Sequence, residues 1–180
     1  KLQKVFPIMI TTCISAHRLG EPEPMFVMTG MDEPSQCNIA MSLVPIIRGK
    51  ELMLVGDPQQ LSPVILLDEL TNRKLKRKYH VAEEYDYRKN SIYKTFLACD
   101  PVSDEVLLHN HYRCNEKIIE FNNRKYYNSR LNICSKTSEE QPLIYVDVRG
   151  TADDRKNVSM AEVGQILCYA KQHREEDIGV

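Results

Sequence analysis

A short apolar run that ends directly in a glycine and a tight polar turn constrains the fold of this chain more than any other feature. The run is Leu52 to Val55, and it is ended by Gly56 and Asp57-Pro58. An unbroken apolar run of this length predicts a strand buried on both faces of a parallel sheet, and Asp-Pro predicts a turn. Open α/β sheets bind their ligands beyond the carboxyl ends of the strands. Asp57 and Gln60 are therefore candidate ligand-binding residues.

A second group of polar residues stands in the same context. Asp32 and Glu33 follow an apolar segment, Met25 to Met31. They precede a helical pattern, Ser35 to Ile47, whose apolar residues are expected to face the sheet. The alternation of strand, helix and strand through Val55 is typical of a doubly wound, nucleotide-binding α/β core. Two adjacent acids at one strand end and an Asp/Gln pair at the next are the groups that a magnesium–nucleotide site requires.

Three short motifs follow one another along the chain: DEPSQ at 32–36, GDPQQL at 56–61 and HYRCN at 111–115. In order and spacing they resemble motifs II, III and IV of the superfamily one helicases, and the similarity is greatest to the Upf-like branch. The resemblance extends over about 8–180. One departure is Pro34, which stands where the family has a small residue.

The resemblance implies a fold and an activity. The fold is an α/β, P-loop NTPase (RecA-like) parallel sheet. The C-terminal part of a first RecA-like domain is expected at 1–113, and the N-terminal part of a second at 114–180. The implied activity is ATP-dependent unwinding of, or translocation on, DNA or RNA, with ATP and Mg²⁺ as cofactors and the nucleic acid as substrate.

The resemblance also implies roles for the polar residues of these motifs. Asp32 would hold Mg²⁺ through water, with Asp57 among the residues that bind the cofactor, and Glu33 would orient or deprotonate the attacking water. Gln60 would hydrogen-bond the γ-phosphate or that water; the alternative is an amide that caps the turn. Arg113 would reach the γ-phosphate with a planar fork suited to its oxygens. The alternative for Arg113 is a surface salt bridge.

Other residues carry weaker signals with open alternatives. Tyr112 could stack on the adenine or be a core tyrosine. Glu162 matches a family acid near the nucleotide ribose, but Ser159 to Glu162 also forms a capping box, and the capping interpretation is favoured. Thr11 and Thr12 resemble the segment through which these helicases contact the nucleic-acid backbone, or they close a turn at a strand end.

The phosphate-binding loop of nucleotide hydrolases is absent from the sequence. The pattern GxxxxGK[ST] needs a glycine five residues before Gly-Lys. The only Gly-Lys is Gly49-Lys50, with Val44 at the place of that glycine and Glu51 at the place of Ser or Thr. The 180-residue chain by itself is therefore expected to be inactive.

Two other classes of function compete with the helicase interpretation. One is a non-catalytic, helicase-derived module that binds nucleic acid or protein. The other is a magnesium-dependent nuclease that uses Asp32, Glu33 and Asp57, but that chemistry has no specific place for Gln60 or Arg113.

The segment at about 67–90 differs in character and is expected to be an inserted charged helical segment. It contains the basic run 72–80, followed by the acids of 83–86. A basic helix could lie along a phosphate backbone. The alternative is a solvated helix whose charge is offset by the acids that follow it, and this second interpretation is favoured.

Composition excludes several classes of protein. The formal net charge is −1, so any nucleic-acid surface must be local rather than global. The six cysteines form no CxxC pair, which favours reduced thiols in a cytoplasmic protein over a disulfide framework or a disulfide-linked partner. No apolar run approaches the ~20 residues that a membrane span needs.

The remaining pattern predicts further elements by apolar runs and by helical periodicity. Strands are expected at 5–12, 105–108, 143–148 and from 178 onward, and helices at 91–99, after a cap at Asn115, and at 159–173.

Overall fold

The computed structural model describes residues 4–136, 142–149, 158–176 and 178–179. The chain divides into two compact units, Lys1–Val106 and Leu107–Val180. Each unit contains its own two-stranded parallel sheet. The predicted α/β class is thus confirmed, while the assignment of 1–113 and 114–180 to two RecA-like domains stays a prediction.

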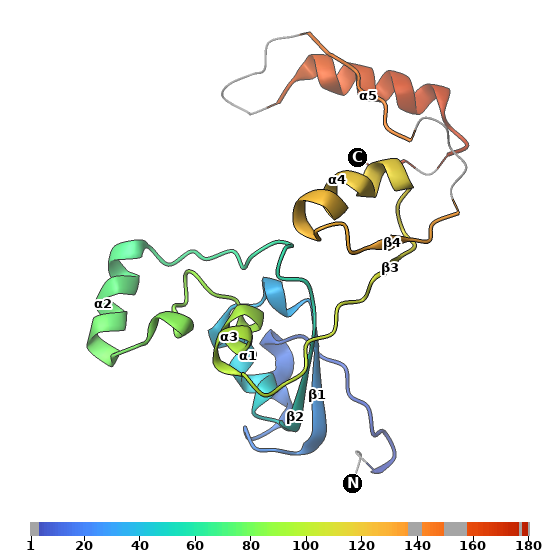
Figure 1. Cartoon of the computed structure of the whole chain (residues 1–180). Helices are drawn as coiled ribbons and strands as arrows, with labels where there is room; N and C mark the ends of the chain where they lie inside the picture. The colour runs from blue at the N-terminus through green and yellow to red at the C-terminus, as the bar shows by residue number, and fades with distance from the viewer. Residues whose placement is uncertain (1–3, 137–141, 150–157, 177, 180) are drawn as a thin grey trace. The chain divides into compact units, whose positions relative to one another are not determined.

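The sheet of the first unit consists of β1 (Phe26–Asp32) and β2 (Gly49–Val55). The strands run parallel and pair from Phe26 opposite Gly49 to Asp32 opposite Val55. The connection between them contains a 3-10 turn, η3 (Pro34–Gln36), and helix α1 (Ile39–Ile46), which packs on β2 (Figure 1). This confirms the predicted strand, helix and parallel strand.

The prediction that the second strand is buried on both faces is wrong. Side chains along β2 alternate between half-buried and exposed, and Met53 is 47% exposed. The expected apolar stripe of α1 is also only partly covered, because Leu43 and Ile47 are exposed while Ser42 is the fully buried residue. The cause is the same in both cases: among the described residues the sheet has only two strands, so much of its surface stays open.

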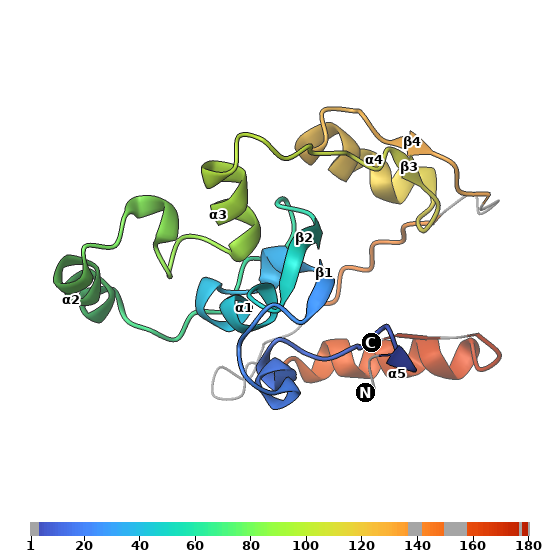
Figure 2. The same cartoon turned by 90° about the horizontal axis from the view of Figure 1, so that it is seen from below.

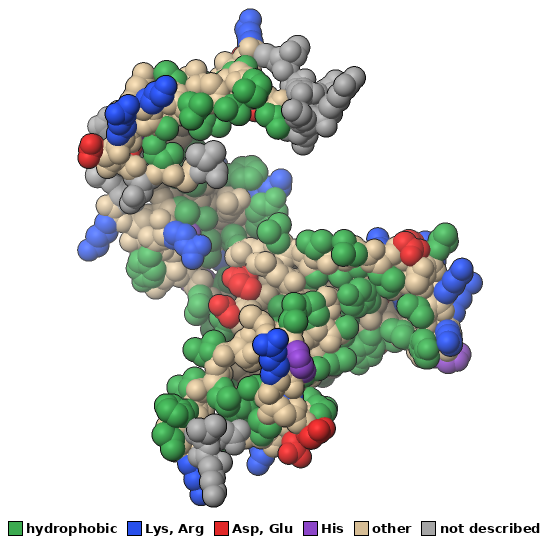
Figure 3. Space-filling view, turned by 180° about the vertical axis from the view of Figure 1, so that it is seen from behind, with side chains coloured by type: hydrophobic (Ala, Val, Ile, Leu, Met, Phe, Trp, Pro, Cys, Tyr) green, Lys and Arg blue, Asp and Glu red, His purple; other side chains and the backbone are tan. Residues whose placement is uncertain are grey.

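Three further expected strands do not form in the described part of the chain. The segments 5–12, 105–108 and 143–148 have extended or irregular backbone without a partner strand. A strand is stable only when its backbone groups find partners on a neighbour, and without one these runs expose their apolar side chains, as Ile10 does at 96%. Figure 3 shows hydrophobic side chains spread over the visible face. The strand expected from 178 falls on residues that are only partly described.

A buried arginine holds the segment that precedes β1. Arg48 is 2% exposed and follows α1. Its guanidinium donates to the carbonyl oxygens of Glu21 at 2.7 Å and Gly20 at 2.5 Å. Its own carbonyl accepts from the N–H groups of Met25 and Phe26 at 2.9 Å each. Arg48 therefore fixes where β1 begins and ties it to the chain that follows η2 (Ile14–Leu19).

The charged segment predicted at about 67–90 folds into helix α2 (Glu69–Tyr79), capped by Asp68, and the turn η4 (Glu83–Tyr85). Helix α3 (Ile92–Cys99) follows, which confirms the helix predicted at 91–99, and Ser91 caps it. In Figure 1 and Figure 2, α3 lies beside α1, whereas α2 lies apart from the sheet.

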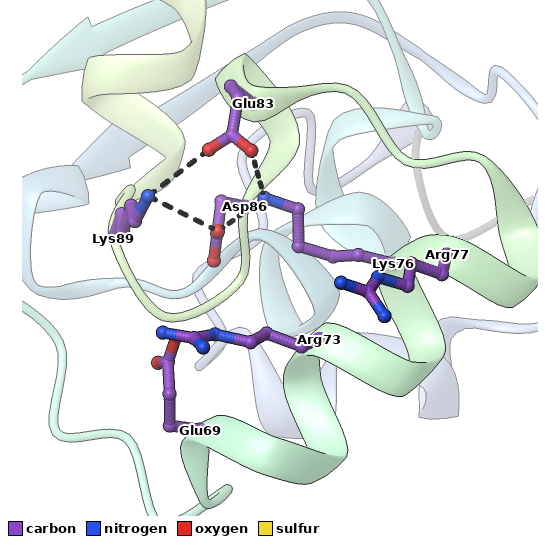
Figure 4. A pocket seen from close by; sticks show the side chains of 7 residues that line it. All are labelled: Glu69, Arg73, Lys76, Arg77, Glu83, Asp86 and Lys89. Atoms are coloured by element: carbon purple, nitrogen blue, oxygen red, sulfur yellow. Dashed lines mark hydrogen bonds and ion pairs between the residues drawn. The ribbon is translucent and has the colours of Figure 1, made fainter.

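A buried carboxylate organises this segment. Asp86 accepts a hydrogen bond from Lys76 Nζ at 2.6 Å (Figure 4). It also accepts from Asn72 Nδ2 and from the Arg88 N–H, each at 3.0 Å. Burial alone would raise the pKa of Asp86, but the hydrogen bonds from Lys76 and Asn72 outweigh it and lower the pKa to about 2. Lys76 also bonds Glu83 at 2.7 Å. Part of the basic run is therefore neutralised by the acids that follow it, as the favoured interpretation held.

The second unit begins with β3 (Asn110–His111), which pairs in parallel with β4 (Asn132–Ile133). Helix α4 (Glu116–Tyr126) lies between them and is capped by Asn115, as predicted. Asn123 fixes the return of the chain, because its side chain accepts from the Leu131 N–H at 3.0 Å and donates to the Leu131 carbonyl at 3.1 Å.

Helix α5 (Met160–Gln172) confirms the helix predicted at 159–173. None of the helices in the described part of the chain combines the length and the apolar character that crossing a membrane requires.

Candidate active site

The parallel register brings the two acidic strand ends to one edge of the first sheet. Asp32 is the last residue of β1 and pairs with Val55, the last residue of β2. Asp57 follows Val55 by two residues. Asp32 and Asp57 thus leave the same carboxyl edge, which is where parallel sheets place their ligands.

Glu33 has an unusual backbone for a non-glycine residue. Its φ of 51° lies in the left-handed region, which costs about 1 kcal/mol or more. Its N–H donates to the Val55 carbonyl at 2.9 Å and to Asp32 Oδ1 at 3.1 Å. Its carboxylate accepts from Gln36 Nε2 at 3.3 Å. Glu33 is therefore held from both ends while its side chain stays exposed to solvent.

Pro34 and Gly56 join the two motifs by direct packing. Pro34 is fully buried. A Cβ atom on Gly56 would meet Pro34 Cδ at 2.7 Å and Cγ at 3.0 Å, so a larger residue at 56 does not fit without a shift. The departure of Pro34 from the family pattern thus has a structural role, because its ring fills the space that the glycine leaves.

The turn after β2 is closed by its own side chains. Asp57 Oδ1 accepts from the Gln59 N–H at 2.9 Å, and Oδ2 accepts from Gln60 Nε2 at 3.1 Å. This is the turn-capping arrangement considered for Gln60. Since the amide nitrogen of Gln60 is engaged, its Oε1 is the atom left to face a ligand, and an amide oxygen can accept a hydrogen bond from a water molecule.

Tyr93 lies near this turn, and the sequence pattern predicts only an amphipathic helix at its position. Burial, followed by the negative charges of Glu105 and Asp57, raises the pKa of Tyr93. The first turn of α3, which carries Tyr93, is attached to the end of DEPSQ because the Ile92 N–H donates to the Cys37 carbonyl at 3.0 Å. The tyrosine is thus a neighbour of the motif that sequence reasoning missed.

The Thr11-Thr12-Cys13 segment lies beside the end of the same motif. Burial, followed by the neighbouring Cys13 thiol, raises the pKa of Cys37 to about 11. Thr12 Oγ1 accepts from the Ser15 N–H at 3.2 Å, so this hydroxyl closes a turn at the start of η2. Both threonines are exposed. All six cysteines are free.

The second unit carries the remaining predicted site residues. Tyr112 is 68% exposed, so it is not a core tyrosine here, and Arg113 beside it is exposed as well. The Glu162 N–H donates to Ser159 Oγ at 3.4 Å, which matches the capping interpretation of this pair.

The available groups suit a magnesium ion that is bound mainly by a nucleotide and by water. Among the described residues, no group of three His, Cys, Asp or Glu side chains gathers that could cage a metal. Magnesium is commonly held by one or two carboxylates together with substrate phosphates and waters. The exposed carboxylate of Asp32 and the half-exposed one of Asp57 are hard oxygen donors that fit this mode.

Comparisons with known proteins agree with these features. An AAA domain family model matches residues 4–68. An uncharacterized ATP-dependent helicase of Methanocaldococcus jannaschii is 32% identical over 101 residues, which cover 56% of this chain and 13% of the relative. The RNA helicase Mov10l1 of Mus musculus is 26% identical over 217 aligned residues, covering 97% of this chain and 18% of the relative.

A third relative is the DNA replication ATP-dependent helicase/nuclease DNA2 of Gallus gallus, 26% identical over 130 residues, or 72% of this chain and 12% of the relative. The chain thus spans less than a fifth of the length of these relatives. The matches agree with the resemblance that the three motifs carry to the superfamily one helicases, and they support the predicted P-loop NTPase fold.

Proposed function

We propose that this chain supplies the hydrolytic acids and the phosphate-sensing residues of an ATP-dependent helicase or translocase that acts on nucleic acid. The observation that carries the proposal is the β1–β2 register, which delivers DEPSQ and GDPQQL to one edge of a parallel sheet. Two of the relatives are named as ATP-dependent helicases, one of them in DNA replication, and the third is named as an RNA helicase. The proposed substrate is therefore DNA or RNA.

The residues of the first unit would divide the chemistry among them. Asp32 and Asp57 would hold Mg²⁺, which neutralises charge on the transferred phosphoryl group. Glu33 would orient or deprotonate the attacking water. The two hydrogen bonds that its N–H donates support this role, because they fix the backbone of the proposed base. Gln60 would accept a hydrogen bond from that water through Oε1, because its nitrogen is engaged by Asp57.

Arg113 of the second unit would provide the cationic fork for the γ-phosphate. Guanidinium groups bind phosphate oxygens through two parallel hydrogen bonds. Its exposure next to Tyr112, also exposed, supports a role toward a ligand rather than in a core. Tyr112 would offer its ring to the base of the nucleotide. For Glu162, the hydrogen bond from its N–H to Ser159 Oγ supports the capping alternative.

Thr11 and Thr12 would contact the nucleic-acid backbone. The contact between Cys13 and Cys37 supports this assignment. Thr11 and Thr12 directly precede Cys13, and Cys37 directly follows DEPSQ. The free thiols support a reducing compartment, for which we propose the cytoplasm.

The test is Glu33→Gln in the full-length helicase to which this chain is proposed to belong, called the parent protein below, measured as ATP hydrolysis stimulated by nucleic acid. The substitution keeps the shape but removes the base, so ATP binding should persist while turnover falls by roughly 10²-fold or more. Glu51→Gln, an exposed acid on β2, is the matched control and should leave turnover unchanged.

Near-parental turnover of Glu33→Gln would contradict the assigned role. The isolated 180-residue chain is a second reference. It should not hydrolyse ATP, because it lacks the backbone cradle and lysine that bind the β- and γ-phosphates. A parent that binds nucleic acid but never hydrolyses ATP would favour the alternative of a non-catalytic binding module.

A further inference from the structure

The motif HYRCN forms a turn in which two exposed residues stand between two anchored ones. His111 is half-buried and ends β3, and Asn115 is buried and caps α4. Between them Tyr112 and Arg113 are exposed. The turn is bridged from inside, since the N–H of Cys114 donates to Nε2 of the His111 ring at 2.9 Å.

This hydrogen bond defines the chemical state of the ring. A backbone N–H can only donate, so Nε2 must carry a free lone pair. The imidazole is then neutral with its proton on Nδ1, because an imidazolium has no acceptor nitrogen. Either the other neutral tautomer or the charged ring would leave the Cys114 N–H without this partner.

The backbone on both sides of the bridge is fixed by other contacts. The carbonyl of His111 accepts from the Cys134 N–H at 2.8 Å, which ties the strand end to the chain after β4. Asn115 Oδ1 accepts from the Lys117 N–H at 3.0 Å, which ties the other end to α4. The hydrogen bond from the Cys114 N–H to the His111 ring therefore bridges the part of the turn that contains the exposed Arg113.

We propose that His111 is a positioning residue: its ring, as the Nδ1-protonated neutral tautomer, holds the turn that presents Arg113. The importance of Arg113 rests on the proposed function, whereas the state of the ring does not. His109 offers a matched comparison. Its Nδ1 lies 2.8 Å from the Arg130 carbonyl, so its ring holds the β3–β4 end and does not touch the turn.

The first experiment measures the ring directly in the 180-residue chain, labelled with ¹⁵N at histidine and cysteine. We expect protonated Nδ1 and unprotonated Nε2 for His111, and a scalar coupling across the N–H···N bond between Cys114 N and His111 Nε2. A proton on Nε2 of His111, or no coupling to Cys114, would overturn the proposal.

The second experiment compares variants in the parent protein. His111→Leu removes the acceptor, and His111→Gln restores one, because a glutamine side-chain oxygen reaches nearly as far as Nε2. Hydrogen–deuterium exchange of the peptide that contains Cys114 should become roughly tenfold faster with Leu and return toward normal with Gln. ATP turnover should fall and recover in the same order. His109→Leu, which removes a ring contact of similar length, should change neither readout.

The outcomes separate the two proposals. Fast exchange in His111→Leu with normal turnover in both His111→Leu and Arg113→Ala means that the function assigned to Arg113 fails while the ring still holds the turn. Loss of turnover in Arg113→Ala but not in His111→Leu means that His111 does not position the arginine. Equal losses of turnover in His111→Leu and His111→Gln would likewise overturn the acceptor role.

Discussion

The acids at the end of β1 and the acid at the centre of the charged segment are chemically alike, yet the fold treats them in opposite ways. Asp32 and Glu33 are exposed and are held mainly by backbone hydrogen bonds. Asp86 is buried, with 3% of its side chain exposed, and is held by a lysine, an asparagine and an N–H. Carboxylates that must act on a ligand stay accessible, whereas a carboxylate that builds structure is enclosed by its donors.

The comparison is tested most strongly at Asp86. Asp86→Ala removes the buried carboxylate and leaves the half-buried Lys76 ammonium without its closest partner, and breaking a buried pair typically costs about 3–5 kcal/mol. We expect a loss of this order in the unfolding free energy of the first unit, measured by urea denaturation. Glu33→Gln is the contrasting variant and should leave stability nearly unchanged. Equal stabilities of the two variants would show that the segment does not depend on Asp86.

The same carboxylate predicts a dependence on pH. Its pKa is lowered in the folded state from 3.8 to about 2, so its contribution to stability is fully present above 3.8 and is lost as the pH falls toward 2. The free energy of unfolding should be measured from about pH 5, roughly one unit above the unfolded-state pKa, down to about pH 2. Over this range it should fall less steeply with decreasing pH in Asp86→Asn than in the natural chain. Identical slopes would mean that the folded carboxyl has an ordinary pKa.

Arg113 tests the exposed side of the comparison. Arg113→Lys keeps the charge but loses the bidentate fork, so both Lys and Ala substitutions should reduce ATP turnover in the parent, by roughly 10²-fold. Nucleic-acid binding without nucleotide should be retained in both variants. Normal turnover with Lys would mean that only charge matters at this position, and normal turnover with Ala would mean that Arg113 has no part in the reaction.

A smaller effect is expected where the two motifs touch. Gly56→Ala places a methyl group against the Pro34 ring, and such overpacking typically costs about 1–3 kcal/mol. Gly164→Ala in α5 is the control, because nothing lies within 4 Å of a Cβ atom there and alanine favours a helix interior. Thermal unfolding should show a lower midpoint for the first variant and an unchanged or higher one for the second.

The smallest effect is expected on the outer side of α2. Lys76 forms ion pairs with Asp86 and Glu83. Lys74 and Lys78 are exposed to solvent and represent the solvated face of the helix. The double variant Lys74→Glu with Lys78→Glu should leave nucleic-acid affinity nearly unchanged. If these lysines instead contacted phosphates, each lost contact would reduce the slope of log K against log salt by about one. Titrations of the parent and the variant at several salt concentrations distinguish the two.

Local signals in the sequence predicted structure well. Asn115 and Ser159 each cap the helix they were expected to cap, because a cap needs only the next three residues. The turn at Asp57 is local for the same reason. The parallel pairing of β1 with β2 also followed from the pattern, since a helix between two apolar runs permits little else.

Features that depend on distant residues could not be predicted. The run 5–12 has strand character, but a strand needs a partner and none of the described segments supplies one. Tyr93 lies near Asp57, and Cys13 lies near Cys37, because separate elements pack together. No spacing of residues along the sequence predicts such contacts. Pro34 appeared as a departure from a motif because the glycine it contacts lies 22 positions away along the chain.

The left-handed backbone of Glu33 has a consequence for attempts to improve this protein. Selection for heat resistance alone rewards residues that relax a strained φ, and Gly and Asn adopt a φ of 51° at lower cost than Glu. Such a selection would favour replacement of the proposed base, and the resulting proteins would be more heat-stable but would no longer hydrolyse ATP. An engineer should therefore hold position 33 constant and seek stability at sites such as Gly164, where added bulk meets open space.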